Sequence, residues 1–279
     1  MEYKMKTIKT LLSASIISLS LASVTSAAHT MHSSDNKQLT QAVASEHRSA
    51  ANKMRDEYRH PQQTLEFFGF KSTMTVVEIT PGGGWYTEIL APALKGKGKL
   101  IGAHYPDTGE DNYYSNSRKK LEKKLASHEI FSEVELSNFV PKKASELAPA
   151  GTADMVLTFR NLHNWGEDGV SQVFVDAFKA LKAGGVLGVV EHRLPKGATA
   201  NDNNRGYVSM DKTIAQAEAA GFTLVASSEV NANAKDMASY EKGVWTLPPS
   251  FALKDKNKEK YSSIGESDRM TLKFAKVAK

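Results

Sequence analysis

The chain has 279 residues, of which 41% are hydrophobic and 24% charged, and its formal net charge is +5. This length and composition suit one large α/β domain with a full hydrophobic core. The absence of cysteine excludes disulfides and cysteine nucleophiles. The modest positive charge gives no case for nucleic-acid binding.

The amino-terminal segment has the pattern of a secretory signal. Lys4, Lys6 and Lys9 precede an apolar, serine-rich stretch at 11–24, and small residues suited to signal peptidase follow at 25–28. We expect residues 1–27 to be removed as a signal peptide, which lowers the net charge to +3, and residues 28–37 to form a flexible tail. The apolar stretch is too short for a comfortable transmembrane helix, so an uncleaved anchor is the less favoured alternative. The sequence therefore predicts an exported, most simply periplasmic, protein without stable membrane insertion after signal removal.

Residues 38–279 are expected to form one domain in which strands and helices alternate. The apolar periodicity predicts helices at 39–58, 61–70, 85–94, 118–124, 169–182 and 207–220, and strands at 76–80, 99–103, 153–159, 186–190, 222–227 and 270–275. Pro92 is expected to kink or end its helix. The insertion at 231–268 has weak periodicity and is either a lid or surface decoration. This alternation implies a doubly wound, mostly parallel sheet, which binds ligands outside the carboxyl ends of its strands.

The most informative motif follows the first predicted strand. That strand carries the acid Glu78, and Thr80 and Pro81 then lead into three glycines, Gly82, Gly83 and Gly84. Consecutive glycines let backbone N–H groups approach a ligand closely, and a helix that begins there presents its positive end to the same ligand. Ordinary tight turns also use glycine, so this motif alone leaves both interpretations open.

Three ordered motifs resemble the class I S-adenosylmethionine-dependent methyltransferases. Residues 78–84 are similar to that family's acid-and-glycine cofactor loop, residues 154–165 to its fourth strand and following turn, and residues 181–187 to the entry into its fifth strand. More narrowly, the sequence from Pro81 to Tyr86 resembles a group of exported predicted methyltransferases, and the likeness extends to residues 243–249 and 265–270. The resemblance implies a Rossmann-like fold, S-adenosylmethionine as cofactor and a small-molecule substrate.

The resemblance also implies which residues lie at the methyl donor. The expected donor-site residues are Glu78, Thr80, Gly82, Gly83, Gly84, Tyr86, His104 and Asn161. Two of them depart from the family pattern. Thr80 stands where the first glycine of the loop is usual, and a β-branched residue there restricts the backbone. The second strand ends at His104 instead of the acid that holds the ribose hydroxyls.

Polar residues that follow two other strands are the candidates for catalysis. His163 follows the strand at 153–159, and Glu191 and His192 follow the strand at 186–190. Because methyl transfer requires alignment and sometimes removal of a proton, either histidine could serve as the base, with Glu191 orienting its neighbourhood. A histidine that only orders its loop is the plain alternative. The sequence predicts no metal site.

Two other classes of function compete with a methyltransferase. S-adenosylmethionine is made in the cytoplasm, and the sequence indicates no supply of it to an exported protein. This favours a non-catalytic protein that binds another small ligand. The cluster of His163, Glu191 and His192 favours a hydrolase or lyase on the same fold. Fold does not decide between these functions.

Overall fold

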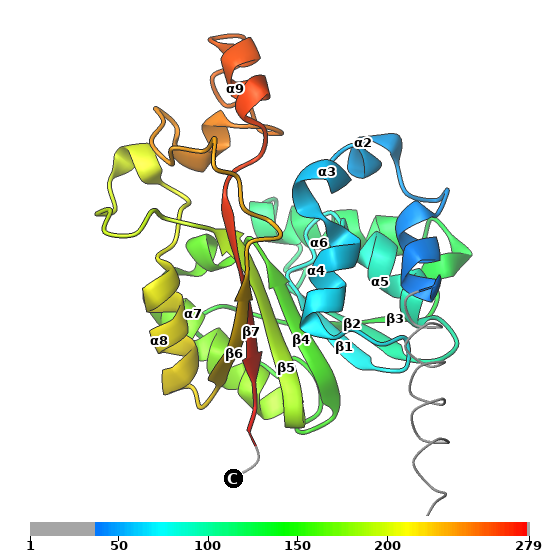
Figure 1. The fold of residues 1–279 in the computed structure, drawn as a ribbon. Coiled ribbons are helices and arrows are strands. Elements are labelled where there is room, and N and C mark those ends of the chain that lie inside the picture. Colours follow the sequence, from blue (N-terminus) through cyan, green and yellow to red (C-terminus); the bar gives the residue numbers. More distant parts are fainter. Residues whose placement is uncertain (1–36, 278–279) are drawn as a thin grey trace, which may run out of the picture.

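A computed structural model describes residues 37–277 (Figure 1). The predicted signal peptide at 1–27 lies outside the described residues, and so does most of the predicted tail, whereas Lys37 already lies in a helical segment at 37–44. No helix within 37–277 combines the length and apolar character needed to cross a membrane.

The core of the fold is a seven-stranded sheet in the order β3-β2-β1-β4-β5-β7-β6. Its strands are β1 (Thr75–Ile79), β2 (Lys99–His104), β3 (Val134–Asn138), β4 (Ala153–Phe159), β5 (Leu181–His192), β6 (Thr223–Ser228) and β7 (Arg269–Ala275). The first five strands pair in parallel, and β7 runs antiparallel between β5 and β6. The predicted doubly wound, mostly parallel sheet is therefore confirmed. Its strand order reverses between β1 and β4, where such sheets bind ligands.

Helices cover both faces of the sheet. The α-helices are α2 (Ala50–Lys53), α3 (Asp56–Arg59), α4 (Pro61–Phe68), α5 (Thr87–Leu94), α6 (Tyr113–Leu125), α7 (Leu162–Ala180), α8 (Met210–Ala219) and α9 (Lys258–Ile264), and the 3₁₀ helices are η1 (Glu129–Phe131), η2 (Asp202–Asn204) and η3 (Gly243–Thr246). Segment 37–44, α4 and α5 bury apolar side chains against one face of the sheet, and α7 and α8 bury theirs against the other. Each face thus has its own hydrophobic core.

The predicted helix at 39–58 is wrong as a single element. The helical segment ends at residue 44, and α2 begins after Ser49, whose side chain accepts a hydrogen bond from the Asn52 N–H as an N-cap. Between them, the Arg48 guanidinium is buried and makes two 2.8 Å hydrogen bonds to Asp56. These local side-chain bonds compete with continuous helix and divide the segment.

Pro92 neither ends nor visibly interrupts α5, contrary to the prediction, because the helix continues to Leu94. A proline lacks the N–H that would bond to the carbonyl four residues earlier, here that of Glu88. His47 Nε2 lies 2.7 Å from that carbonyl oxygen and takes the place of the missing donor. The contact ties the amino-terminal helical region to α5.

Two further differences concern the edges of elements. α7 begins at Leu162, seven residues before the predicted start, because Gly166 (φ 67°) joins a short first turn to the main helix. β3 was not predicted at all. It is an edge strand whose side chains are largely solvent-accessible, so it lacks the apolar run that marks the central strands.

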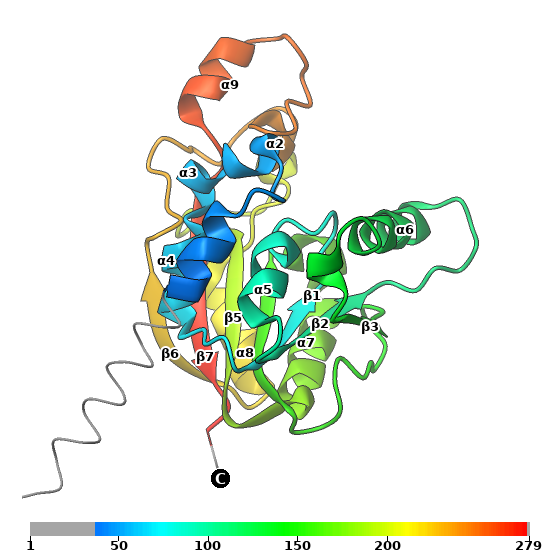
Figure 2. The same ribbon diagram turned by 90° about the vertical axis from the view of Figure 1, so that its right-hand side faces the viewer.

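The insertion at 231–268 forms a small layer beyond the carboxyl ends of the strands. Its apolar side chains make a separate cluster with Leu194 and Tyr207, which includes Tyr240, Leu247 and Tyr261. Both ribbon views place α9 at the same end of the molecule as α2 and α3 (Figures 1 and 2). The insertion therefore stands over the end of the sheet at which ligands are expected.

Candidate functional site

The loop between β1 and α5 has an unusual backbone. Thr80, Gly82 and Gly84 all have positive φ angles of 50°, 60° and 76°. This conformation suits glycine and strains a β-branched residue, so Thr80 holds a glycine-like conformation at an energetic cost. A Cβ on Gly82 would meet no atom within 4 Å, whereas Gly83 and Gly84 face the lysines of α6. Only the first of the three glycines faces open space.

Glu78 holds the start of α5. Its side chain is 3% exposed and accepts a 2.6 Å hydrogen bond from the Thr87 hydroxyl. Burial raises the pKa of this carboxyl to about 7, against the opposing influence of Thr87 and Arg160. The carboxyl thus connects the end of β1 to the first residue of α5, on either side of the glycine loop.

A cavity of about 690 Å³ opens at the carboxyl ends of β2 and β3. Its wall includes three aromatic rings, Tyr105, Tyr114 and Trp165, together with Asn164 and Lys142. The Trp165 Nε1 donates a 3.1 Å hydrogen bond to the Tyr105 hydroxyl. The backbone N–H of Thr80 donates a 2.7 Å hydrogen bond to the carbonyl of Ala103, two residues before Tyr105. The cavity therefore adjoins the glycine loop.

His104 does not reach this cavity. Its side chain is fully buried, and Nε2 lies 3.2 Å from the Ser117 hydroxyl of α6. Burial lowers the pKa of His104 to about 4, which keeps the ring neutral. Because side chains alternate along a strand, His104 faces α6 and the next residue, Tyr105, faces the cavity. The sequence analysis names His104, whereas the next residue, Tyr105, lines the cavity.

Asn161 and Tyr86 both have structural roles beside the loop. The Asn161 amide donates to the carbonyl oxygens of Ile79 and Thr80, at 3.1 and 3.4 Å. The Tyr86 ring is 2% exposed and stacks on Phe159, with a centroid distance of 3.5 Å. Asn161 ties the start of α7 to the glycine loop, and Tyr86 packs beneath that loop.

The structure brings the three predicted catalytic residues together. The Glu191 carboxylate is buried, accepts a 2.7 Å hydrogen bond from the Leu162 N–H and caps the amino terminus of α7. Its other oxygen accepts a 2.7 Å bond from the His192 N–H and lies 3.1 Å from Nδ1 of His163. The carboxylate therefore favours the tautomer of His163 that carries its proton on Nδ1. The lone pair of Nε2 has no hydrogen-bond partner within the described part of the chain, so His163 and Glu191 form a dyad with a free base.

His192 is the neighbour of this dyad. Its ring lies 5.3 Å from that of His163, and its Nδ1 is 2.5 Å from the Ser267 hydroxyl. Burial first, and then the adjacent His163 and Arg269, hold the pKa of His192 well below its usual value. The Trp245 ring of the insertion lies 5.9 Å from His163. Residues of the insertion thus border the dyad, which agrees with the lid alternative more than with surface decoration.

The same three side chains are the ones among residues 37–277 that could together hold a metal ion, since their ligand atoms all lie within 4.8 Å of one another. The Glu191 oxygens already accept backbone hydrogen bonds, and the remaining position is taken by His163 Nδ1. A metal would have to displace that hydrogen bond. The geometry therefore favours the dyad over a metal centre.

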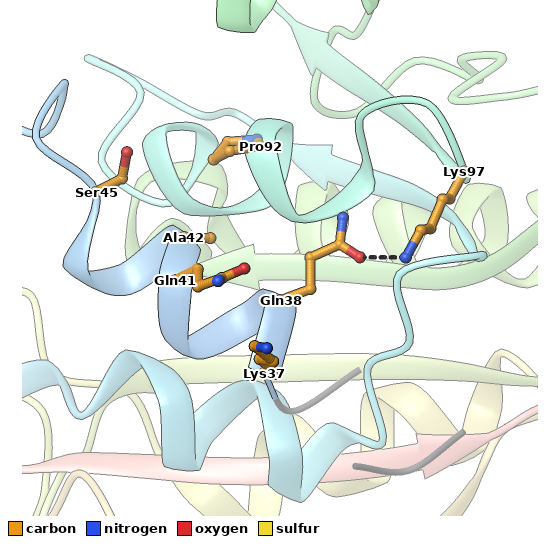
Figure 3. A pocket seen from close by; sticks show the side chains of 7 residues that line it. All are labelled: Lys37, Gln38, Gln41, Ala42, Ser45, Pro92 and Lys97. Atoms are coloured by element: carbon orange, nitrogen blue, oxygen red, sulfur yellow. Dashed lines mark hydrogen bonds between the residues drawn. The ribbon is translucent and has the colours of Figure 1, made fainter. Parts of the chain in front are cut away.

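A second hollow, of about 530 Å³, lies between segment 37–44 and α5 (Figure 3). There the Lys97 ammonium donates a 2.8 Å hydrogen bond to the Gln38 side chain, and Pro92 forms the opposite wall. None of the predicted site residues lines this hollow. It is a feature of helix packing.

No family model matches the chain, and no curated protein matches it. Solved structures do. A SAM-dependent methyltransferase from Aquifex aeolicus is 19% identical with a TM-score of 0.52, covering 63% of this chain and 87% of its own. The [4+2]-cyclase SpnF is 13% identical with a TM-score of 0.56, covering 90% and 96%. A SAM-dependent methyltransferase from Methanosarcina mazei is 10% identical with a TM-score of 0.51, covering 77% and 97%. These similarities show that the chain has the Rossmann-like fold of the class I methyltransferases.

Proposed function

We propose that the protein is an S-adenosylmethionine-dependent methyltransferase that acts on a small molecule. The observation that carries the proposal is the aromatic cavity beside the glycine loop, at the carboxyl ends of parallel strands. Its volume of about 690 Å³ lies within the range of roughly 300–1,000 Å³ that is usual for ligand sites. Three motifs of the sequence, in the order of the family, support the same conclusion.

The residues present fit this donor. Tyr105, Tyr114 and Trp165 offer ring faces to a planar base. Gly82 leaves room for a ligand to approach the backbone of the loop. When bound, the donor supplies an electrophilic methyl group on a sulfonium.

The dyad would serve the acceptor. His163 Nε2 accepts the proton that a hydroxyl or amine loses on methylation, while Glu191 holds the ring and stabilises the imidazolium that forms. His192 stays neutral beside it, because its low pKa opposes a second positive charge. The first turn of α7 carries both His163 and the cavity residue Trp165, so the base and the proposed donor site lie at the same end of the sheet.

The narrower assignment is part of the proposal. The sequence from Pro81 to Tyr86 supports membership of the exported methyltransferase group, and the pattern at 1–28 supports a periplasmic location. Mass spectrometry of the protein from a periplasmic extract tests the location, with a mature amino terminus near Ala28 as the expected result.

Tryptophan fluorescence tests donor binding in a way that reports on the proposed cavity. We expect S-adenosylhomocysteine to change the emission of the wild type saturably, since Trp165 lines the cavity. Trp165→Phe should lose this response. Trp245→Phe should keep it, because Trp245 borders the dyad and does not line the cavity. A folded wild type without any response contradicts the proposal.

A lyase or hydrolase is the second candidate. The paired histidines beside a buried carboxylate favour it, and the similarity to a cyclase indicates that this fold is used for reactions outside methyl transfer. This candidate predicts that the dyad is needed for activity but that S-adenosylhomocysteine does not bind.

A further inference from the structure

Three arginines contact one carboxylate near His192, and a fourth, Arg160, interacts with that carboxylate electrostatically. Arg55 and Arg59 come from the region of α3, Arg160 follows β4, Arg269 begins β7, and Glu266 ends the insertion. We call these four arginines the arginine cluster. Glu266, Arg59 and Arg269 are at most 4% exposed. The cluster is built by three separate parts of the chain that meet at the end of the sheet.

Glu266 binds three of the four guanidinium groups. Its Oε1 lies 2.5 Å from Nε of Arg55, and its Oε2 contacts Nη2 of Arg269 and lies 3.3 Å from Nε of Arg59. Buried donors remain: Arg59 Nη1 and Arg269 Nε have no hydrogen-bond partner within residues 37–277. An unpaired buried donor is destabilising, and more so when it is charged. The cluster therefore holds more donors than the protein satisfies.

The guanidinium of Arg160 makes no hydrogen bond and no ion pair within residues 37–277. Its backbone has a φ of 61°, which a non-glycine residue adopts at a cost, and its N–H donates a 2.7 Å bond to the Val190 carbonyl. Strained residues of this kind concentrate at functional sites. The backbone is fixed while the charged end of the side chain stays uncommitted.

Neighbouring acids do not neutralise the surplus. Asp56 is paired with Arg48, and the Glu191 carboxylate is occupied by N–H groups and His163. The Glu78 carboxyl near Arg160 accepts a hydrogen bond from Thr87, and burial raises its pKa to about 7. Burial and the nearby Arg269 lower the pKa of Arg160 to about 10, and burial and the nearby Arg160 lower that of Arg59. Four cations therefore face one firmly ionised carboxylate, that of Glu266, whose pKa the surrounding arginines hold near 2 despite burial.

We propose that the arginine cluster binds an anionic group, a carboxylate or phosphate, of the methyl acceptor, with Arg160 as its principal ligand. A guanidinium matches either anion with two parallel hydrogen bonds. An anion there would pair the free donors of Arg59 and Arg269 as well as Arg160. The assignment of this anion to the methyl acceptor rests on the proposed function, whereas the anion site itself does not.

Position argues for the acceptor over the donor. None of the cluster residues lines the aromatic cavity, although Arg59 lies 4.6 Å from the ring of Trp85, directly after the glycine loop. Arg269 instead lies opposite His192 in the antiparallel register of β5 and β7, and His192 lies beside the dyad. An anionic substrate held by the cluster would thus present its other end to the base on His163.

Thermal unfolding in inorganic phosphate at constant ionic strength tests the anion site. The wild type should gain melting temperature saturably, by about 5 °C at a hundredfold excess over Kd. Arg160→Gln should fold, since it removes no protein contact, and should lose most of the gain. Arg205→Gln, the same change at an exposed arginine, should keep it. Equal responses of wild type and Arg160→Gln overturn the proposal, as does a wild type that phosphate does not stabilise.

A second arm separates acceptor from donor. S-adenosylhomocysteine carries a carboxylate, and 5′-methylthioadenosine has the same nucleoside without it. The proposal predicts that Arg160→Gln leaves the affinity for both ligands unchanged. A selective loss of S-adenosylhomocysteine binding in Arg160→Gln would assign the cluster to the donor and overturn the proposal. If neither ligand binds the wild type but phosphate does, the anion site stands and the methyltransferase function fails.

Discussion

Burial changes the pKa of Glu78, the acid that precedes the glycine loop. Its carboxyl lies beneath the loop, hydrogen-bonded to Thr87, and its pKa is raised from 4.5 to about 7. Between these two values the folded protein binds more protons than the unfolded chain. The stability that Glu78 contributes is therefore complete below pH 4.5 and is lost as the pH rises through 7.

Replacing this carboxyl should change how stability depends on pH. Glu78→Gln keeps an oxygen that accepts from Thr87 but does not ionise, so we expect it to gain about 3 kcal/mol relative to wild type between pH 4.5 and pH 8. Urea unfolding of both proteins at several pH values measures the difference, and the titration of His104 cancels because both contain it. Parallel stability curves would show that Glu78 titrates normally.

The proximity of the three predicted catalytic residues could be predicted because adjacent parallel strands end at the same edge of a sheet. This rule placed His163 near Glu191 and His192, and the structure has the 3.1 Å contact. The same rule does not locate His104, which faces α6 while Tyr105 lines the cavity. Which of two neighbouring residues faces the cavity depends on where the strand ends to within one position. The arginine cluster was not predictable, because Arg59 and Arg269 are 210 positions apart in the sequence.

At the scale of elements, α5 depends on a donor from another segment. His47 supplies the hydrogen bond to the Glu88 carbonyl that Pro92 cannot make. Burial lowers the pKa of His47, so the ring is neutral and donates through Nε2 while Nδ1 accepts from the Ser45 hydroxyl, 2.6 Å away. A sequence pattern signals the proline but not the distant side chain that compensates for it.

A double-mutant cycle isolates this compensation. His47→Ala leaves the Glu88 carbonyl without its donor and should destabilise the protein by about 1–3 kcal/mol. Pro92→Ala restores a backbone N–H at that carbonyl, so His47→Ala should cost about 1 kcal/mol less in the Pro92→Ala background. Urea unfolding of the four proteins gives the coupling energy. Strictly additive effects would mean that His47 stabilises α5 only by packing.

The sheet as a whole could be predicted from the sequence, because its central strands are apolar runs separated by helical periodicity. β3 was missed because an edge strand buries little of its surface. The insertion lies between β6 and β7, and its packing against α3 depends on ionic contacts of Glu266 that no periodicity records.

Across the whole molecule, the glycine loop and most of the aromatic cavity lie on one side of the point where the strand order reverses, and the dyad lies on the other. Arg59 and Arg160 of the cluster lie between them, near Trp85 and Glu78. This division suits a donor on one side and an anionic acceptor on the other. The account therefore depends most on whether the donor binds.

Calorimetric titration of the purified chain with S-adenosylhomocysteine measures this directly, with Gly82→Asp as the matched control. Aspartate tolerates the left-handed backbone of Gly82 and enters open space, so the variant should fold but place a carboxylate where the ligand approaches the backbone of the loop. We predict saturable one-to-one binding by the wild type that is lost in Gly82→Asp. A folded wild type that releases no heat and gains no thermal stability with this ligand would contradict the account.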